Sequence, residues 1–208
     1  MLTLRVTSNW AYFRPPTSRN MRDTYTVMPP ATAIGFLLSL VGSTDYTDAK
    51  GTEITIIQHK GYKPQPVIVS RKIRRNKLPP KSERPRPPKE GWRTVSSTEN
   101  PIERQQYLVD HEVYLRVEGG AVEEKLREAF RTGWRSVDRF GALSCGESNC
   151  IVDSVDLVDN ESVETSEFVA LKPNPRGRMT LPVRQSYLDL SKTVWGRFEW
   201  VPATEIAQ

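Results

Sequence analysis

The sequence predicts an α+β fold with a ferredoxin-like, RRM-like core, in which two helices cover one face of a four-stranded antiparallel sheet. Strand and helix patterns follow one another in the order β-α-β-β-α-β over residues 1–158. A basic segment is inserted between the second and third strands, at about residues 62–104, and residues 159–208 contain further strand patterns. We therefore expect one domain over residues 1–158 that carries a basic insertion, followed by a β-rich C-terminal appendage.

The first half of the core predicts a strand, a helix and a second strand. Residues 2–7 alternate between apolar and polar side chains, which is typical of a strand with one buried face. Residues 28–42 contain two prolines near their start, apolar residues at helical spacing and a glycine at their end. This pattern predicts a buried helix of about three turns. Residues 53–58 are rich in β-branched side chains and predict the second strand.

Residues 66–73, at the start of the insertion, are expected to extend into the base of the basic segment. After the insertion, the second half of the core begins with residues 106–117, which alternate as a third strand. Residues 121–137 place apolar side chains at helical intervals, and residues 151–158 supply the fourth strand. In the tail, residues 194–200 are the clearest of two or three strand-like pieces.

The most unusual segment is residues 71–93, which carries ten lysines and arginines, two acids and five prolines. The whole chain has 30 basic and 25 acidic residues, so the remainder carries 20 basic and 23 acidic residues. Positive charge concentrated in one segment attracts a polyanion and makes its binding depend on salt. A solvated, partly disordered loop is the plain alternative. Because the segment begins and ends next to strand patterns rather than at a terminus, we favour a phosphate-bearing partner.

A second informative segment, residues 139–149, lies between the second helix and the fourth strand. Its glycines, Gly141 and Gly146, stand five apart with small residues between them, so the backbone can approach a ligand and direct N–H groups at phosphate. The segment has neither the Gly-Lys-Ser/Thr ending of a Walker loop nor the setting of a dinucleotide fingerprint. Taken alone, it also fits a tight turn that leads into the last strand.

The composition argues against several classes of protein. Apolar content of 37% and charged content of 26% are typical of a soluble protein. The longest nearly apolar run, residues 33–41, is much shorter than the roughly 20 residues that span a bilayer, so we expect no membrane segment and no signal peptide. Two cysteines, Cys145 and Cys150, and two histidines, His59 and His111, are too few for a disulfide scaffold or a convincing zinc site. We predict a cytoplasmic protein without a metal or cofactor.

Three segments together resemble the Cas five family, whose members are RAMP-superfamily subunits of the Cascade CRISPR effector. They are residues 11–16, which follow the first strand, residues 24–37, which contain the pattern Tyr-x-x-x-Pro-Pro-x-Thr-Ala-Ile, and the glycine segment at residues 141–148. The resemblance covers about residues 1–158. The second and third segments are its most specific part.

The resemblance implies a fold and a set of partners. Family members have a ferredoxin-like core, a glycine-rich loop before the last core strand, and a protruding thumb where the basic segment of this chain lies. They cap the 5′ end of the CRISPR RNA by holding its repeat-derived handle, and they contact the Cas seven backbone subunit and usually a Cas eight-type large subunit that reads the PAM. The implied function is a non-catalytic crRNA-binding subunit that meets target DNA indirectly, through the complex.

Three kinds of group suited to holding the handle are available. Cationic side chains can neutralise phosphates, backbone N–H groups at a glycine loop or helix start can bind phosphate oxygens, and aromatic rings can stack on splayed bases. Core packing is an equal alternative for the aromatic candidates Trp10, Tyr12, Phe13 and Trp92. The residues that we predict to bind RNA are Arg14, Arg19, Arg22, Tyr25, Ala31, Thr32, Arg71, Arg74, Arg75, Lys77, Arg139, Gly141, Ser144, Gly146 and Ser148.

Metal-free cleavage of precursor RNA is an alternative function. Such chemistry needs a base for the 2′-hydroxyl proton and a cation for the developing charge. The cleaving members of the family use a trio that includes an adjacent Lys-His pair, whereas here His59 precedes Lys60 and His111 follows Asp110. The cleavage pattern is therefore not visible. Tyr46, Lys60 and one of the two histidines are the only candidates for it.

Two further functions stay open. The chain is compatible with a type III effector subunit of the same RAMP group, which would bind a 5′ tag beside different protein partners. It is also compatible with an unrelated basic RNA-binding module. Bulky substitutions at Gly141 and Gly146 are expected to release RNA if this segment holds a handle, and mainly to reduce stability if it is a simple turn.

Overall fold

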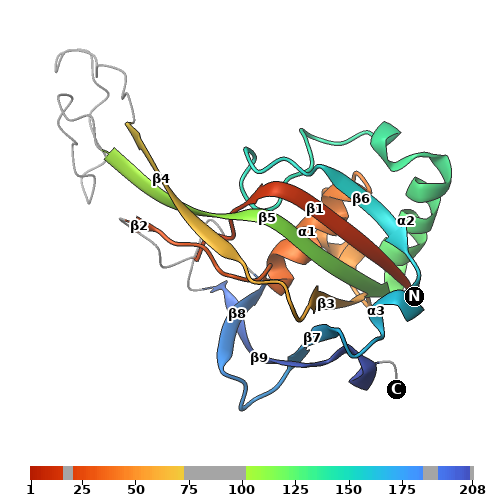
Figure 1. Ribbon diagram of the computed structural model, residues 1–208. Coiled ribbons are helices and arrows are strands. Elements are labelled where there is room, and N and C mark those ends of the chain that lie inside the picture. The colour runs from red at the N-terminus through yellow and green to blue at the C-terminus, as the bar shows by residue number, and fades with distance from the viewer. Residues whose placement is uncertain (16–20, 73–101, 185–191, 207–208) are drawn as a thin grey trace.

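The computed structural model describes residues 1–15, 21–72, 102–184 and 192–206. Within these residues the strands form one nine-stranded sheet, and seven of them follow the order β6-β1-β5-β3-β7-β9-β8 (Figure 1). No helix in the described part is long and apolar enough to cross a membrane. The strands are β1 (Leu2–Ala11), β2 (Met21–Arg22), β3 (Glu53–His59), β4 (Gln65–Lys72), β5 (Ile102–Glu118), β6 (Ser154–Val158), β7 (Phe168–Pro173), β8 (Met179–Arg184) and β9 (Val194–Pro202).

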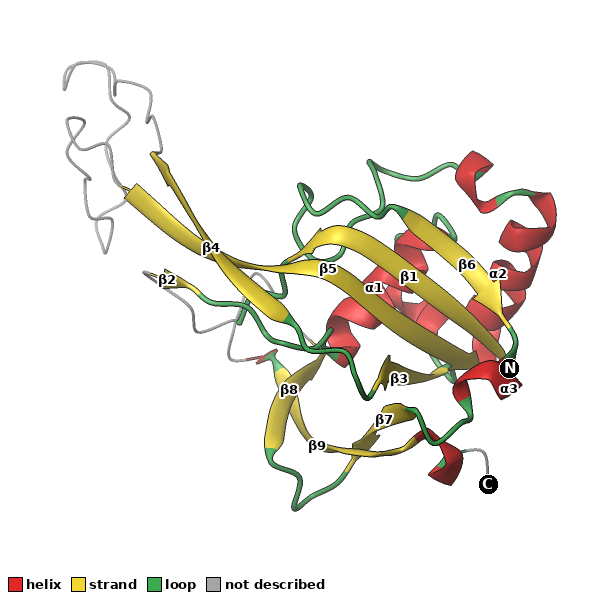
Figure 2. Cartoon of the chain, in the orientation of Figure 1, coloured by secondary structure: helices red, strands yellow, loops and turns green. Residues whose placement is uncertain are grey.

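The helices lie mainly on one face of this sheet, where α1 and α2 pack behind β6, β1 and β5 (Figure 2). The helices are α1 (Pro30–Leu40), α2 (Gly120–Thr132) and α3 (Asn160–Val163), with short 3₁₀ turns at Tyr46–Ala49, Trp134–Ser136 and Ala203–Glu205. The chain is therefore a mixed α+β protein. The helix predicted at residues 28–42 and the strand predicted at residues 106–117 correspond to α1 and β5.

The main core forms between the helices and four antiparallel strands, β6, β1, β5 and β3. Leu4 on β1 stands opposite Leu115 on β5, and both are fully buried. Leu37 of α1 and Leu126 of α2 belong to the same cluster of buried side chains. Burying an aliphatic side chain of this size contributes about 1.5–3 kcal/mol, so the alternation in β1 and the helical spacing in α1 are both satisfied by one core.

The second helix is shorter than its apolar spacing predicts. The prediction extends it to Val137, but α2 ends at Thr132 because Gly133 adopts a positive φ of 98°. A left-handed glycine after the last turn is a common way for a helix to stop. Trp134 then begins a 3₁₀ turn and packs partly buried against the core.

A two-stranded ribbon protrudes from the body of the molecule (Figure 1). The second half of β5 pairs with β3, whereas its first half pairs with β4, from Gln65 opposite Val109 to Lys72 opposite Ile102. Asp110, at the junction of the two halves, has a positive φ of 51°. The predicted insertion thus begins as an antiparallel ribbon, and residues 73–101, which hold most of its predicted positive charge, lie outside the described residues.

The C-terminal strands continue the sheet from the β3 side. β7 pairs with β3, with Leu171 opposite Ile56, and β9 then joins β7 to β8. On the face away from α1, Val163 of α3 packs against Ile57 in a second, smaller core. The buried guanidinium of Arg116 donates to the carboxylate of Glu164 at 2.7 Å. The tail is β-rich, and a domain boundary at residue 158 stays a prediction.

Candidate nucleic-acid interface

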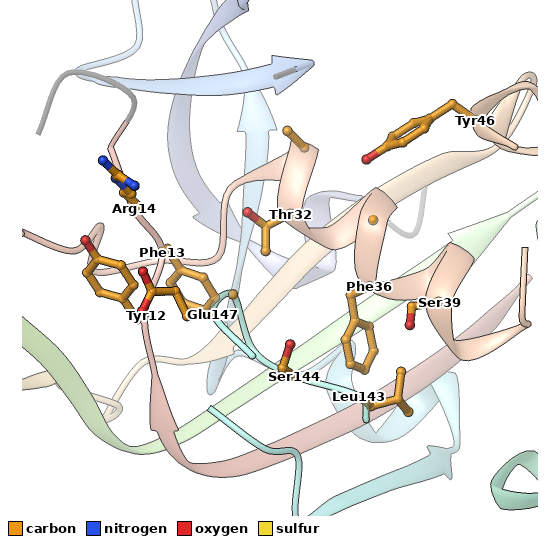
Figure 3. A pocket seen from close by; sticks show the side chains of 13 residues that line it. Tyr12, Phe13, Arg14, Thr32, Phe36, Ser39, Tyr46, Leu143, Ser144 and Glu147 are labelled. Carbon is orange, nitrogen blue, oxygen red and sulfur yellow. The ribbon is translucent and has the colours of Figure 1, made fainter. Parts of the chain in front are cut away.

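A cleft of about 420 Å³ lies where the end of β1, the start of α1 and the glycine segment meet (Figure 3). Arg14 and Tyr46 stand at opposite ends of it, and Thr32 and Ser39 reach it from α1. It therefore brings together three segments that are far apart in the sequence. Its lining residues are Tyr12, Phe13, Arg14, Ala31, Thr32, Gly35, Phe36, Ser39, Tyr46, Leu143, Ser144, Gly146 and Glu147.

The chain after β1 is fixed by backbone hydrogen bonds, which place Arg14 at the mouth of the cleft. The N–H of Tyr12 donates to the carbonyl of Cys145 at 3.0 Å, and the N–H of Tyr25 donates to the carbonyl of Phe13 at 3.0 Å. Tyr12 and Phe13 are fully buried, so they pack in the core rather than offer ring faces. Arg14 is exposed, which leaves its guanidinium accessible to an anion.

Helix α1 lines the cleft with small side chains. Ala31, Gly35 and Ser39 are spaced four apart, so they lie on one face of the helix. The N–H of Thr32 donates to the carbonyl of Pro29 at 2.9 Å, so Thr32 offers its hydroxyl rather than its N–H to the cleft. Small residues in this row allow a ligand to approach close to the helix.

The glycine segment is a tight hairpin. The N–H of Cys145 donates to the carbonyl of Cys150 at 2.8 Å, and the N–H of Val152 donates to the carbonyl of Leu143 at 3.1 Å. Gly146 has a φ of 99° and lies against the backbone of Tyr12, where a side chain would overlap the Tyr12 carbonyl. The close approach of two backbones therefore explains this glycine without any ligand.

Two side-chain hydrogen bonds connect this hairpin to the ribbon half of β5. Asn149 Nδ2 donates to the hydroxyl of Tyr107 at 3.0 Å, and Gln105 Nε2 donates to Glu147 Oε2 at 2.9 Å. Among the described residues that line the cleft, Glu147 is the acidic one and Arg14 the basic one. The lining thus offers one cationic side chain that can pair with an anion, Arg14, and one carboxylate that can accept N–H or O–H groups, Glu147.

Comparison with known proteins decides the family. Residues 1–197 match the family model described as CRISPR-associated protein (Cas_Cas5). The chain belongs to this Cas5 family. It is similar in fold to a chain of a solved "CRISPR RNA-guided surveillance complex", with a TM-score of 0.66, 14% sequence identity, and coverage of 97% of this chain and 89% of that one.

A second solved structure, titled "Crystal structure of Cas protein", matches with a TM-score of 0.55 and 13% sequence identity, over 96% of this chain and 93% of that one. No curated protein matches the chain. The match to the surveillance-complex chain covers 97% of this chain and so includes the C-terminal strands. The shared fold therefore extends past residue 158.

In this Cas5 chain, Arg139 is engaged in the structure. Its Nη2 atom donates to the carbonyl of Leu40 at 3.3 Å and to that of Trp134, and its guanidinium lies 5.6 Å from the Trp134 ring centre. Leu40 ends α1, so the arginine stabilises the carbonyl end of that helix. Burial lowers the pKa of Arg139 from its ordinary value. Its proposed phosphate contact would compete with these bonds.

The other predicted residues fall into three groups. Arg14, Ala31, Thr32, Ser144 and Gly146 line the cleft together. Tyr25 is half-buried against the core, and Gly141 and Ser148 are exposed beyond the lining of the cleft. Burial raises the pKa of Tyr25. Arg22 belongs to β2 and Arg71 to β4. The remaining candidates lie outside the described residues: Arg19, Arg74, Arg75, Lys77 and the aromatic candidate Trp92.

The candidates for RNA cleavage do not come together. His111 is buried, its Nδ1 lies 3.0 Å from the Tyr62 hydroxyl, and burial lowers its pKa to about 4. His59 lies at the end of β3, and its ring centre is 5.3 Å from that of Phe168. Phe168 packs against the second, smaller core, on the face of the sheet away from α1. Tyr46 lines the cleft, but neither histidine nor Lys60 does. The predicted combination of Tyr46, Lys60 and a histidine is therefore not assembled in this cleft.

Burial affects the two cysteines as well. It raises the pKa of Cys145 to about 11 and that of Cys150 to about 12, so both thiols are protonated at neutral pH. Within the described residues, no group of three or more His, Cys, Asp or Glu side chains is arranged to hold a metal ion.

Several lining residues were missed by sequence reasoning. Gly35, Ser39 and Glu147 line the cleft without having been predicted to bind RNA. The spacing of four between Ala31, Gly35 and Ser39 is the signal that could have identified the helix face, because small residues at this spacing share a side. Glu147 lies between Gly146 and Ser148, which were predicted to bind RNA, but an acidic side chain gives no reason to expect a phosphate contact.

Proposed function

We propose that this Cas5-family chain is a non-catalytic crRNA-binding subunit of a Cascade-type interference complex in the cytoplasm, where it caps the 5′ handle of the guide RNA. The observation that carries the proposal is the cleft, which unites the loop after β1, the start of α1 and the glycine segment. These are the same three segments that resemble the family. A single polar cleft lined by all of them is suited to an RNA end.

The arrangement of the sheet supports a ferredoxin-like RAMP core. The order β6-β1-β5-β3, with every neighbouring pair antiparallel and helices on one face, is the arrangement expected of a β-α-β-β-α-β chain. The ribbon of β4 and β5 supports the assignment of residues 62–104 as a thumb, because β4 and the first half of β5 pair with each other and protrude from the body of the molecule (Figure 1).

The chemistry of the cleft suits single-stranded RNA. The Arg14 guanidinium can pair with a phosphate, and the hydroxyls of Thr32 and Ser144 can bond to phosphate or ribose oxygens. Beside the glycine segment, Trp10 is 40% exposed, and its ring meets that of Tyr107 edge to face at 5.4 Å. A tryptophan fixed in this way can stack on a base that leaves the cleft.

Protein partners follow from the same proposal. We propose that the chain joins the Cas seven backbone subunit to a Cas eight-type large subunit and meets target DNA through the complex. An apolar cavity of about 510 Å³ bordered by α1, lined among others by Ile34, Val183 and Phe198, supports a protein contact there. Apolar surface of this kind is more typical of protein interfaces than of RNA sites.

Co-purification tests this function. A tagged chain is expressed with its genomic neighbours and CRISPR array, and the 5′ ends of the retained RNA are sequenced with any dedicated processing nuclease present or deleted. A uniform repeat-derived 5′ tag that disappears with that nuclease supports a non-catalytic cap. The same tag without the nuclease would indicate metal-free cleavage by this chain, and type III partner proteins would indicate the other RAMP assembly. Random RNA, or none, would contradict the proposal.

A further inference from the structure

Phe140 is the most exposed large apolar side chain in the described part of the protein, at 101% of its reference accessibility. It lies between Arg139 and Gly141, in the loop that follows the 3₁₀ turn after α2. A fully exposed phenylalanine gains nothing from the hydrophobic effect in the isolated chain, and its ring is accessible to a partner.

The loop that carries Phe140 is held from both sides. Arg139, directly before it, bonds to the carbonyls of Leu40 and Trp134. Three residues after it, Leu143 is buried and its carbonyl accepts from Val152 at 3.1 Å. The ring is thus presented by a loop that is already ordered, which reduces the conformational entropy lost when a partner binds.

Phe140 lines a hollow that continues the RNA cleft along α1. This hollow has a volume of about 280 Å³, and it shares Gly35, Ser39 and Tyr46 with the cleft. Because Tyr46 and Arg14 stand at opposite ends of the cleft, the hollow adds to the end away from Arg14 (Figure 3). An RNA strand whose phosphate pairs with Arg14 would pass the small side chains of α1 before it reaches the ring of Phe140.

The surroundings of Phe140 favour a nucleobase over a protein side chain. The other residues of the hollow include Ser39, Ser43 and Thr44, which present hydroxyl groups, and no acidic side chain lines it among the described residues. The centre of a protein interface is a contiguous apolar patch. An exposed aromatic ring among hydroxyl groups, with Tyr46 and the cationic side chain of Arg139 in the same lining, is instead typical of a site for single-stranded nucleic acid.

We propose that Phe140 is a stacking site for one unpaired nucleobase of the RNA strand that occupies the cleft. This inference rests on the proposed function, because the strand is placed by Arg14 and α1. Stacking on an aromatic ring tolerates any base, so Phe140 fixes the path of the strand rather than its sequence. Removal of one such stack is expected to weaken RNA binding by about ten-fold.

The test uses the assembled complex, reconstituted with guide RNA that carries 2-aminopurine at one handle position at a time. Stacking quenches the fluorescence of this base. We compare Phe140→Ala, Phe140→Leu and Phe140→Trp, with Leu157→Ala as a control because Leu157 is 50% exposed on β6 and lines neither hollow. We expect one handle position to brighten in the alanine and leucine variants, to stay quenched in the tryptophan variant, and to be unaffected in the control.

Three results would overturn the inference, and they differ from failure of the proposed function. If Arg14→Gln weakens RNA retention while no position responds to Phe140→Ala, the cleft binds RNA and Phe140 does not. If Phe140→Ala releases a protein subunit while the fluorescence of every position is unchanged, Phe140 docks protein. If leucine restores quenching as well as tryptophan does, the contact is not aromatic stacking. RNA retention that is indifferent to Arg14→Gln would count against the cleft itself.

Discussion

Gly146 lies so close to the carbonyl oxygen of Tyr12 that no side chain fits between them. The contact joins the glycine hairpin to the end of β1, where the two residues also form an isolated bridge. It places Ser144 and Glu147 on one wall of the cleft and Arg14 on another. The shape of the proposed RNA site therefore depends on a backbone contact that is made without RNA.

This contact predicts different costs for the two glycines of the hairpin. Gly146→Ala should destabilise the fold by roughly 3 kcal/mol or more, because it adds a clash with backbone to a strained φ of 99°. Gly141→Ala should cost about 1 kcal/mol, since its φ of 78° is strained but nothing lies within 4 Å of the added Cβ. Denaturant unfolding measures both. Equal costs would show that the Tyr12 contact is not tight.

The same comparison changes how the hairpin is tested for RNA binding. Loss of RNA in a Gly146 variant would follow from misfolding alone, so it cannot separate a handle-binding loop from a turn. Gly141 is the informative position of the two, because a substitution there leaves the Tyr12 contact in place.

Arg14 is predicted to contribute directly to RNA affinity. Arg14→Gln should weaken RNA binding about ten-fold and reduce the salt dependence by about 0.7 in the slope of log K against log salt, the value for one phosphate on a single strand. Arg5→Gln removes the same charge from the open face of the sheet, where Arg5 pairs with Glu112 at 3.0 Å, and should leave affinity nearly unchanged. Titration of the reconstituted complex at several salt concentrations checks both. Equal effects of the two variants would point to general charge rather than to the cleft.

His111 predicts a pH dependence of stability. Burial lowers its pKa to about 4 from an ordinary 6.5, so the unfolded chain binds a proton more readily than the folded one. The free energy of unfolding therefore does not depend on this histidine's protonation above about pH 6.5. It decreases as the pH falls toward 4, by about 3 kcal/mol in all, because the unfolded chain takes up the proton first. His111→Phe should remove this part of the slope, because phenylalanine keeps a buried aromatic ring without a titratable group. Unfolding free energies between pH 4.5 and 7.5 provide the measurement, and parallel curves for the native chain and His111→Phe would refute the assignment.

Asp110 marks the point where β5 leaves β3 and enters the ribbon. Its φ of 51° is costly for a residue with a side chain, and glycine would relieve that cost. Glycine also loses more conformational entropy on folding, so the two effects oppose each other and Asp110→Gly should change stability by less than about 1 kcal/mol. Asp110→Val should cost about 2 kcal/mol, because a β-branched side chain resists this conformation. Thermal unfolding of the two variants gives the comparison. If valine were tolerated as well as glycine, the bend in β5 would not depend on this residue.

The core could be predicted from the sequence because its signals are local. Alternation in residues 2–7 and the proline-to-glycine limits of α1 each report directly on a buried face. The end of α2 was predicted too late, because Val137 continues the apolar spacing although Gly133 stops the helix. In that case the apolar period outweighed a single left-handed glycine in the prediction.

The site was predictable only in part, because it depends on tertiary contacts. Resemblance to a family led to Arg14, Thr32 and Ser144, which the fold brings into one cleft. The role of Arg139 could not be predicted, because its bond to the Leu40 carbonyl exists only where the end of α1 meets that loop. Phe140 was missed for a similar reason: the sequence shows a phenylalanine, and only the fold shows that it is fully exposed.

Ultraviolet cross-linking of the assembled complex, followed by mass spectrometry of the peptides joined to the RNA handle, tests the central claim most directly. The cleft account predicts cross-links at residues 10–14, at residues 31–46 and at residues 140–148. Cross-links confined to the open face of the sheet, around Arg5 and Tyr114, or absent from this chain while other subunits carry them, would contradict it.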